Sequence, residues 1–166
     1  MNQRDYAADL GALGYPGFAY VKVLSIADPA ELLLHALNES DLDSRIAEGL
    51  PWLVLTFYDV DWCWLVENAK LQGRQNRLGF IVLLAAELAQ SKNDCEHAST
   101  LAASCIYLHI LQTFRLSEED TLCHDSMTEA ERAWVREHRT SAAAHWNLLT
   151  DMKAEQVPYA GSCSAS

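Results

Sequence analysis

The stretch of residues 74–90 constrains the fold of this chain more than any other. Its apolar residues recur at helical spacing and cover a wide face, and they are Leu78, Ile81, Val82, Leu84, Ala85, Leu88 and Ala89. A helix with so wide an apolar face must be covered by other elements on several sides. We therefore expect this helix to lie at the centre of the core.

Capping signals divide the rest of the chain into further helices. Asp28 and Pro29 suit the N-cap and the first helical position, and Thr128 with Glu131 matches a capping box. Asp59 and Asp61 both lie where another N-cap is needed. The predicted helices cover residues 5–13, 28–37, 42–50, 61–72, 74–90, 94–114, 128–138 and 141–152, and the stripe Leu101, Cys105, Leu108 and Leu111 marks the apolar side of the sixth.

Three stretches have more than one interpretation. Either Ser40 or Asp41 is expected to cap the helix over residues 42–50, and Pro51 is expected to end it. The apolar run that follows, residues 52–57, is either a buried helical turn or a buried strand, because periodicity cannot separate the two in so short a segment. Residues 19–26 also fit a strand or a helix, and we favour a helix because no second convincing strand exists to pair with it.

These elements predict an all-α fold in which short and medium helices pack as successive hairpins. The chain has 166 residues, and half of them are hydrophobic, which is ample for one buried core. We expect a helical core domain over residues 1–117 and a C-terminal helical arm over residues 118–153. Residues 154–166, with Pro, Gly and several Ser, are expected to form a disordered tail.

Composition restricts the classes of partner. The formal net charge is −11, which opposes non-specific binding to nucleic acid and favours a basic partner. The apolar runs fall far short of the roughly 20 residues that cross a bilayer, and the N-terminus lacks the basic and apolar regions of a signal peptide. Five widely spaced cysteines suit reduced thiols. We expect a cytoplasmic protein that does not enter a membrane.

The most distinctive passage is a predicted helical hairpin over residues 61–88. We expect Trp62 and Leu65 on its first helix to pack against Leu78 and Ile81 on its second. Gly79 lowers helix propensity, and its role would be to let two helices approach closely. Most of the hairpin's conspicuous residues are thereby assigned to packing.

The same passage resembles a known family. Its first helix carries Trp62, Leu65 and Ala69, and its second begins Arg77-Leu78-Gly79-Phe80. This resembles the C-terminal helical region of AbiEi-type antitoxins, where a W-x-x-L-x-x-x-A helix precedes an R-L-G-Y/F helix. The resemblance implies an antitoxin that neutralises a nucleotidyltransferase toxin and represses its own operon. That family also carries an N-terminal winged helix-turn-helix, whose pattern is not found in residues 1–50, so DNA binding is not carried over.

Basic residues in the hairpin form one candidate binding site. Lys70, Arg74 and Arg77 fall at i, i+4 and i+7, which would place them on one side of a continuous helix. They would bind a phosphate or the acidic surface of a partner. The alternative is that they belong to a solvated turn with no ligand.

The helix after Thr128 supplies a second candidate site. Arg132, Arg136 and Arg139 share one face of this helix, and Trp134 lies on the opposite side. We expect Trp134 to hold the helix against the body and the arginines to point outward toward a protein partner, with Trp146 in the same contact arm. Simple amphipathicity is the alternative.

No metal site, cofactor site or catalytic motif is expected. Zinc-binding proteins space their cysteines and histidines in pairs that are absent here, and no phosphate-binding or nucleophile motif occurs. The loop acids Glu118, Glu119, Asp120 and Asp125 are the basis for an enzyme alternative. A pairing of Cys123 with a histidine is a second conceivable catalytic arrangement.

These observations favour a protein-binding regulatory factor, antitoxin-like or immunity-like, over an enzyme. Its partner would be a basic toxin or effector, because the chain itself is strongly acidic. One alternative is a transcriptional regulator, with residues 74–77 as the candidate for a basic recognition helix. The other is a small enzyme that uses the acidic loop.

Overall fold

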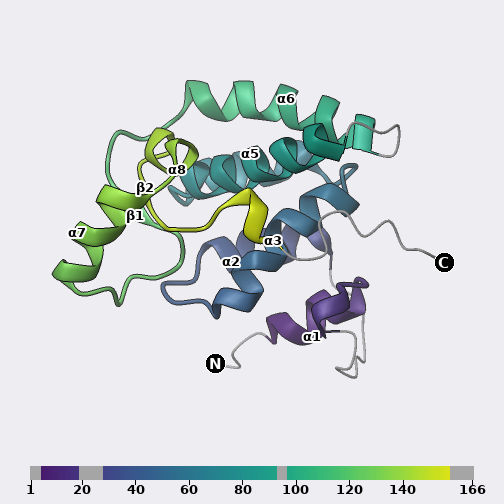
Figure 1. Cartoon of the computed structure of the whole chain (residues 1–166). Coiled ribbons are helices and arrows are strands. Elements are labelled where there is room, and N and C mark those ends of the chain that lie inside the picture. The colour runs from purple at the N-terminus through teal and green to yellow at the C-terminus, as the bar shows by residue number, and fades with distance from the viewer. Residues whose placement is uncertain (1–4, 19–27, 93–96, 158–166) are drawn as a thin grey trace.

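The chain folds around one central helix, α5 (Gln75–Lys92). The computed structural model describes residues 5–18, 28–92 and 97–157. Helix α6 (Ala98–Thr113) packs along α5 on one side, and α3 (Ser44–Thr56) packs on another (Figure 1). Leu78, Ile81 and Leu84 of α5 are almost completely buried. The predicted central helix is therefore confirmed.

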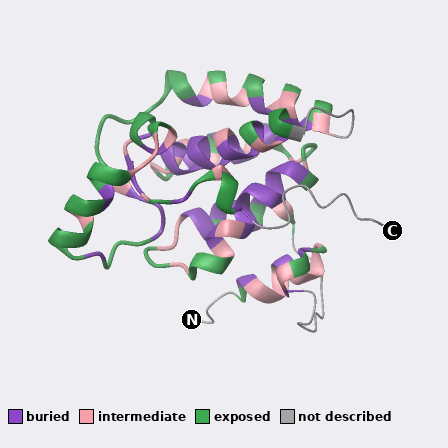
Figure 2. Cartoon of the chain, viewed as in Figure 1, coloured by how far each residue is buried: buried purple, intermediate pink, exposed green. Residues whose placement is uncertain are grey.

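Shorter helices surround these three and confirm an all-α architecture. They are α1 (Tyr6–Ala12), α2 (Pro29–Leu37), α4 (Trp62–Leu71), α7 (Glu129–His138) and α8 (Ser141–His145), with 3₁₀ turns η1 (Pro16–Phe18) and η3 (Ala154–Gln156). Two very short strands, described below, are the only β-structure besides one isolated bridge in the described residues. Figure 2 shows burial concentrated on α5 and on parts of α2 and α3.

The predicted caps are present where the sequence signals them. The Asp28 carboxylate accepts a hydrogen bond from the Ala30 amide at 2.9 Å, and that of Asp61 accepts one from the Trp64 amide at 3.1 Å. Thr128 and Glu131 form a complete capping box. Each cap satisfies amides that the helix leaves without a partner, so these boundaries are locally encoded.

Helix α3 differs from its prediction at both ends. Its N-cap is Asp43, whose carboxylate accepts from the Arg45 amide at 2.8 Å, whereas Asp41 binds Ser126 instead. Pro51 lies inside the helix, and residues 52–56 continue it. The expectation that Pro51 ends the helix was wrong, because burial of the following apolar residues outweighs the loss of one backbone hydrogen bond.

The buried side of α6 also differs from the predicted stripe. Its fully buried residues are Thr100, Ser104 and Leu111, whereas Cys105 is exposed. The Thr100 hydroxyl donates to the Leu55 carbonyl at 2.9 Å, which accounts for one buried polar group in this side. The buried side of α6 therefore includes Thr100, a polar residue with an internal hydrogen-bond partner, and excludes Cys105, which the predicted stripe had included.

The C-terminal third contains a small parallel sheet that the sequence did not signal. Strand β1 (Asp120–Thr121) pairs with β2 (Leu148–Leu149), with Asp120 opposite Leu148. The predicted helix over residues 141–152 accordingly ends at His145, and Asn147 turns the chain with a φ of +55°. Helices α7 and α8 form the connection between the two parallel strands (Figure 1).

The segment predicted as a separate arm packs into the main core. Trp146 and Leu148 belong to the same buried cluster as the residues of α5, and Leu149 joins Met127 and Val135 in a smaller one. The expected tail begins with described structure, because residues 154–156 form η3 and Val157 is buried. The rest of the predicted tail, residues 158–166, and the helix favoured for residues 19–26 lie outside the described residues.

Candidate functional site

The first turn of α5 fastens segments that are distant in the sequence. The side-chain Nε2 of Gln75 donates to the Phe114 carbonyl at 3.1 Å. The Asn76 amide nitrogen donates to the carbonyls of Leu116 and Trp146, both at 2.9 Å, and its oxygen accepts from the Leu116 amide at 2.8 Å. This turn therefore holds the end of α6 and the end of α8 in fixed positions.

Arg77, in the same turn, is a buried structural cation. Its side chain is 1% exposed and donates twice to the Asp120 carboxylate, from Nε at 2.9 Å and from Nη2 at 3.1 Å. Its Nη1 donates to the carbonyls of Leu37 and Glu39 at 2.8 and 3.0 Å, at the end of α2. The prediction that Arg77 is available to a partner is wrong, because its donors are used inside the protein.

Two groups beside Arg77, the Asp120 carboxyl and the Cys123 thiol, have shifted pKa values. Burial alone would raise the pKa of Asp120, but hydrogen bonds from Arg77 and from the Thr121 amide lower it below its ordinary value of 3.8. Burial raises the pKa of Cys123 to about 11, despite the nearby guanidinium. The Cys123 thiol donates to the Ala36 carbonyl at 3.4 Å. Such a thiol stays protonated at neutral pH, which argues against it as a nucleophile.

The indole ring of Trp146 packs directly against Gly79. A methyl group added at Gly79 would lie 2.5–2.7 Å from three ring carbons of the Trp146 indole. Trp146 is 2% exposed, so its predicted place in a surface contact arm is wrong. The predicted close approach at Gly79 exists, and it is an approach of an indole ring from the far end of α8.

Lys70 and Arg74 remain partly accessible but have internal contacts. The Lys70 ammonium lies 3.5 Å from the centroid of the Phe114 ring. Arg74 donates to the Asn38 side chain at 3.1 Å and lies 3.7 Å from the Asp120 carboxylate. Both residues therefore help to hold the ends of α2, α4 and α6 together.

Helix α7 is oriented opposite to its prediction. Its arginines point toward the body: Arg136 binds the Glu119 carboxylate through two hydrogen bonds of 2.7 and 3.0 Å, and Arg139 donates to the Leu148 carbonyl at 3.1 Å. Arg132 donates to two backbone carbonyls of the loop before the helix. Trp134 is 54% exposed and stacks on His138 of its own helix. Trp134 is therefore exposed to a partner, whereas each of the three arginines already has a contact within the protein.

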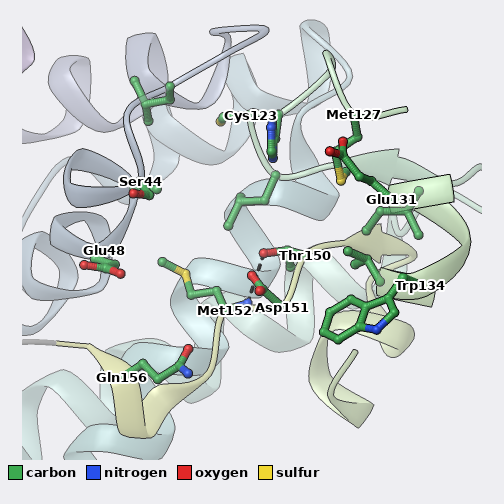
Figure 3. Close-up of a pocket in the computed structure, with 16 residues that line it drawn as sticks. Ser44, Glu48, Cys123, Met127, Glu131, Trp134, Thr150, Asp151, Met152 and Gln156 are labelled. Carbon is green, nitrogen blue, oxygen red and sulfur yellow. Dashed lines mark hydrogen bonds between the residues drawn. The ribbon is translucent and has the colours of Figure 1, made fainter. Parts of the chain in front are cut away.

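Trp134 stands at the edge of a groove of about 570 Å³. The groove runs between the start of α3, helix α7 and the chain that follows β2. Figure 3 shows Glu48 on the α3 side, Trp134 on the α7 side and Asp151 between them. The described residues that line it are Leu42, Ser44, Ala47, Glu48, Leu122, Cys123, His124, Met127, Glu131, Trp134, Val135, Leu149, Thr150, Asp151, Met152 and Gln156.

The groove combines an apolar floor with acidic edges. Leu122, Val135 and Leu149 are buried beneath it. Three carboxylates line it, from Glu48, Glu131 and Asp151, and none of its described lining residues is a lysine or an arginine. Its field is therefore negative, and a cationic group is the ligand class that this field favours.

The pairing of carboxylates with arginines gives the protein a predictable response to acid. Hydrogen bonds from Arg136 lower the pKa of Glu119, in the same direction as the shift at Asp120. A carboxyl whose pKa is lower in the folded state than in the unfolded state stabilises the protein at any pH above its unfolded-state pKa. This stabilisation is lost as the pH falls through its folded-state pKa. We expect the urea midpoint to hold between pH 7 and pH 5 and to fall below about pH 4.

Urea unfolding of the wild type and of Asp120→Asn at pH 6 and pH 3 checks this response. The variant lacks one of the shifted carboxylates, so its free energy of unfolding should change less between the two pH values than that of the wild type. An equal or larger change in the variant would contradict the assignment to Asp120.

No helix in the described ranges is long and apolar enough to cross a membrane, and no group of three or more metal-ligating side chains is found there. The chain matches no protein-family model, no curated protein and no solved structure.

Proposed function

We propose that this chain is a protein-binding regulatory factor, of antitoxin or immunity type, which acts on a basic partner protein in the cytoplasm. The observation that carries the proposal is the groove, with its apolar floor and three acidic edges. A segment of the partner would place aliphatic side chains on the floor and lysine or arginine side chains against Glu48, Glu131 and Asp151. The resemblance of residues 61–88 to AbiEi-type antitoxins supports the antitoxin type of partner binding.

The size of the groove fits side chains of a partner better than a large folded element. Its volume of about 570 Å³ lies within the range of ordinary ligand pockets. Two of its lining residues are methionines, Met127 and Met152, whose flexible side chains adapt to differently shaped apolar groups. A short stretch with two or three anchoring side chains is the expected occupant.

Trp134 would supply much of the binding energy at the groove edge. Tryptophan is enriched among the residues that dominate protein interfaces, and 54% of this side chain is exposed before any partner binds. A partner would cover the indole and gain its apolar area without first displacing a packed neighbour from the core.

Internal contacts weaken the two alternative functions. Arg74 and Arg77, on which a DNA-reading helix would depend, both lie against Asp120. The acidic loop of the enzyme alternative is engaged in the same way, since Glu119 binds Arg136 and Asp120 binds Arg77. These contacts favour the protein-binding proposal over both alternatives. Salt-dependent retention of the chain on its own upstream DNA would support the DNA-binding alternative instead.

The test uses two double variants with the same change in charge. Glu48→Lys with Asp151→Lys reverses the groove, and Glu67→Lys with Glu137→Lys reverses two exposed acids that do not line it. A pull-down from the native cell with mass spectrometry identifies the partner, which is then purified and titrated with each protein. We expect the groove variant to lose about tenfold or more in affinity and the control to lose little.

Trp134→Ala provides a test that does not depend on charge. It should also weaken binding by about tenfold or more, the scale of an interface hot spot. Equal affinity of the wild type, both double variants and Trp134→Ala for the purified partner would overturn the groove as the binding site. Failure to recover any stoichiometric protein partner would overturn the proposed function itself.

A further inference from the structure

The chain continues in an extended form after strand β2, where it lines the groove. Residues 150–153 belong to no helix, strand or turn, and Lys153 has extended backbone angles, with a φ of −129° and a ψ of 151°. Exposure alternates along these residues, because Asp151 and Lys153 are exposed whereas Met152 is buried. Such alternation is typical of a strand with one face on the core. We call residues 150–153 the extended segment.

The extended segment has lost the strand that pairs with β2. The register between β1 and β2 ends with Thr121 opposite Leu149. Beyond that point the chain of β1 bonds to a different neighbour, since the Leu42 amide donates to the Cys123 carbonyl at 2.8 Å. Residues 122–124 and the extended segment are therefore not paired with each other, although both contribute to the lining of the groove (Figure 3).

Main-chain groups of the extended segment are without partners. Among the described residues, no hydrogen bond is formed by the backbone amide or carbonyl of Thr150 or of Asp151. The groups on either side are used, because the Met152 amide donates to the Thr150 hydroxyl at 3.2 Å and Arg139 donates to the Leu148 carbonyl. Unpaired amides and carbonyls along an extended chain are a template for a further strand.

We infer that the groove binds its partner as an extended chain, which adds a strand beside residues 150–153. This inference rests on the proposed function, and it specifies the conformation of the segment that the groove takes. The main chain of Thr150 and Asp151 would form hydrogen bonds with the segment. Its side chains would alternate between the apolar floor and the acidic edges, so the sequence that fits alternates aliphatic and basic residues over about four positions.

A helical segment would not use these main-chain groups. The backbone groups of a helix are already bonded within it, and a helix with its side chains is about 10–12 Å wide. Covering Thr150 and Asp151 with a helix would remove their amides and carbonyls from water without giving them partners. That costs free energy comparable to a lost hydrogen bond for each group. A strand covers the same groups and satisfies them.

Charge favours a basic segment as the occupant and opposes a second copy of this chain. Asp151 lies in the extended segment itself, and Glu48 and Glu131 line the same groove (Figure 3). Two copies that paired through this segment would bring their carboxylates together, and charged residues on an edge commonly prevent such pairing. A lysine or arginine in the added strand would instead lie near these carboxylates and be attracted to them.

Three synthetic peptides test the inference. The parent is a peptide of about six residues in which valine and lysine alternate, with both ends blocked. One derivative is N-methylated at every valine, and the other at every lysine. Successive amides of a strand point to opposite edges, so each derivative loses the donors of one edge. All three peptides keep the same side chains and the same charge.

Strand pairing uses the donors of one edge of the peptide. One derivative should therefore bind about tenfold or more weakly than the other, the scale of one or two hydrogen bonds, as measured by calorimetric titration. Equal affinities would overturn the inference, because attraction by charge does not distinguish the two edges. So would a parent peptide that does not bind at about 1 mM. The proposed function is tested separately, by recovery of the native partner in the pull-down.

Amide hydrogen exchange, followed by nuclear magnetic resonance, locates the added strand. With the parent peptide at saturation, exchange at the amide of Thr150 or Asp151 should slow about tenfold or more, because a hydrogen bond protects the amide. Glu118 is the control, since it lies in an exposed acidic loop and does not line the groove. Its amide should exchange at the same rate with and without peptide. Unchanged exchange at both Thr150 and Asp151 would overturn the inference.

Discussion

Replacing Arg77 with leucine is expected to lower the free energy of unfolding by about 3–5 kcal/mol, the range for breaking a buried ion pair. The variant removes the two hydrogen bonds that Arg77 donates to the Asp120 carboxylate, and it leaves the carbonyls of Leu37 and Glu39 without the guanidinium. Unmet buried acceptors cost more than the hydrogen bonds contribute. Urea unfolding followed by circular dichroism measures the change.

Arg74→Leu is the matched control for Arg77→Leu. Arg74 lies one turn earlier in the chain, also near Asp120, but 28% of its side chain is exposed and its distance to the carboxylate is 3.7 Å. Exposed ion pairs contribute about 1 kcal/mol or less, so the control should lose no more than that. Similar losses in the two variants would show that burial of Arg77 has no special energetic role.

Replacing Trp146 with alanine is the second large change. Removal of a buried tryptophan costs about 3–5 kcal/mol, because the cavity it leaves collapses only in part. Gly79→Ala should also destabilise the protein, by about 1–3 kcal/mol, because its methyl group would overlap a rigid ring. Thermal and urea unfolding measure both effects.

The double variant with Gly79→Ala and Trp146→Ala gives a sharper result, because the effect of Gly79→Ala on the free energy of unfolding should change sign. Without the indole, the added methyl group of Gly79→Ala has room, and alanine stabilises a helix by about 1 kcal/mol relative to glycine. Gly79→Ala should therefore stabilise the Trp146→Ala protein. If it destabilises both backgrounds equally, the indole is not what the glycine accommodates.

Local signals in the sequence predicted local structure well. The caps at Asp28, Asp61 and Thr128 are formed as expected, because a cap depends on residues within a single helical turn. The central helix was equally evident from its wide apolar face. Asp43 was missed as the cap of α3 because Ser40 and Asp41 offer the same chemistry only a few residues earlier.

The orientation of α7 could not be read from its periodicity. The pattern places Arg136 and Trp134 on different faces, but it does not say which face lies against the body. That choice depends on partners such as Glu119, which lies 17 residues before Arg136 and binds it at the surface of the protein. The groove escaped prediction for the same reason, since its three sides come from separate parts of the chain.

Strands β1 and β2 were missed because two residues carry no measurable alternation. The burial of Trp146 follows from the absence of a side chain at Gly79, which is 67 residues earlier in the chain. Sequence reasoning paired Gly79 with the adjacent helix, because neighbouring helices are the commonest partners in a hairpin.

The contacts made by the first turn of α5 also set the order of events during synthesis. Arg77 leaves the ribosome before Asp120, and Trp146 follows Asp120 by a further 26 residues. At typical translation speeds, roughly one to five seconds separate these last two residues. During that interval Arg77 can meet its carboxylate, while the surface around Gly79 waits uncovered. The last segment of the core to be covered is therefore the one over Gly79, after α8 has been made.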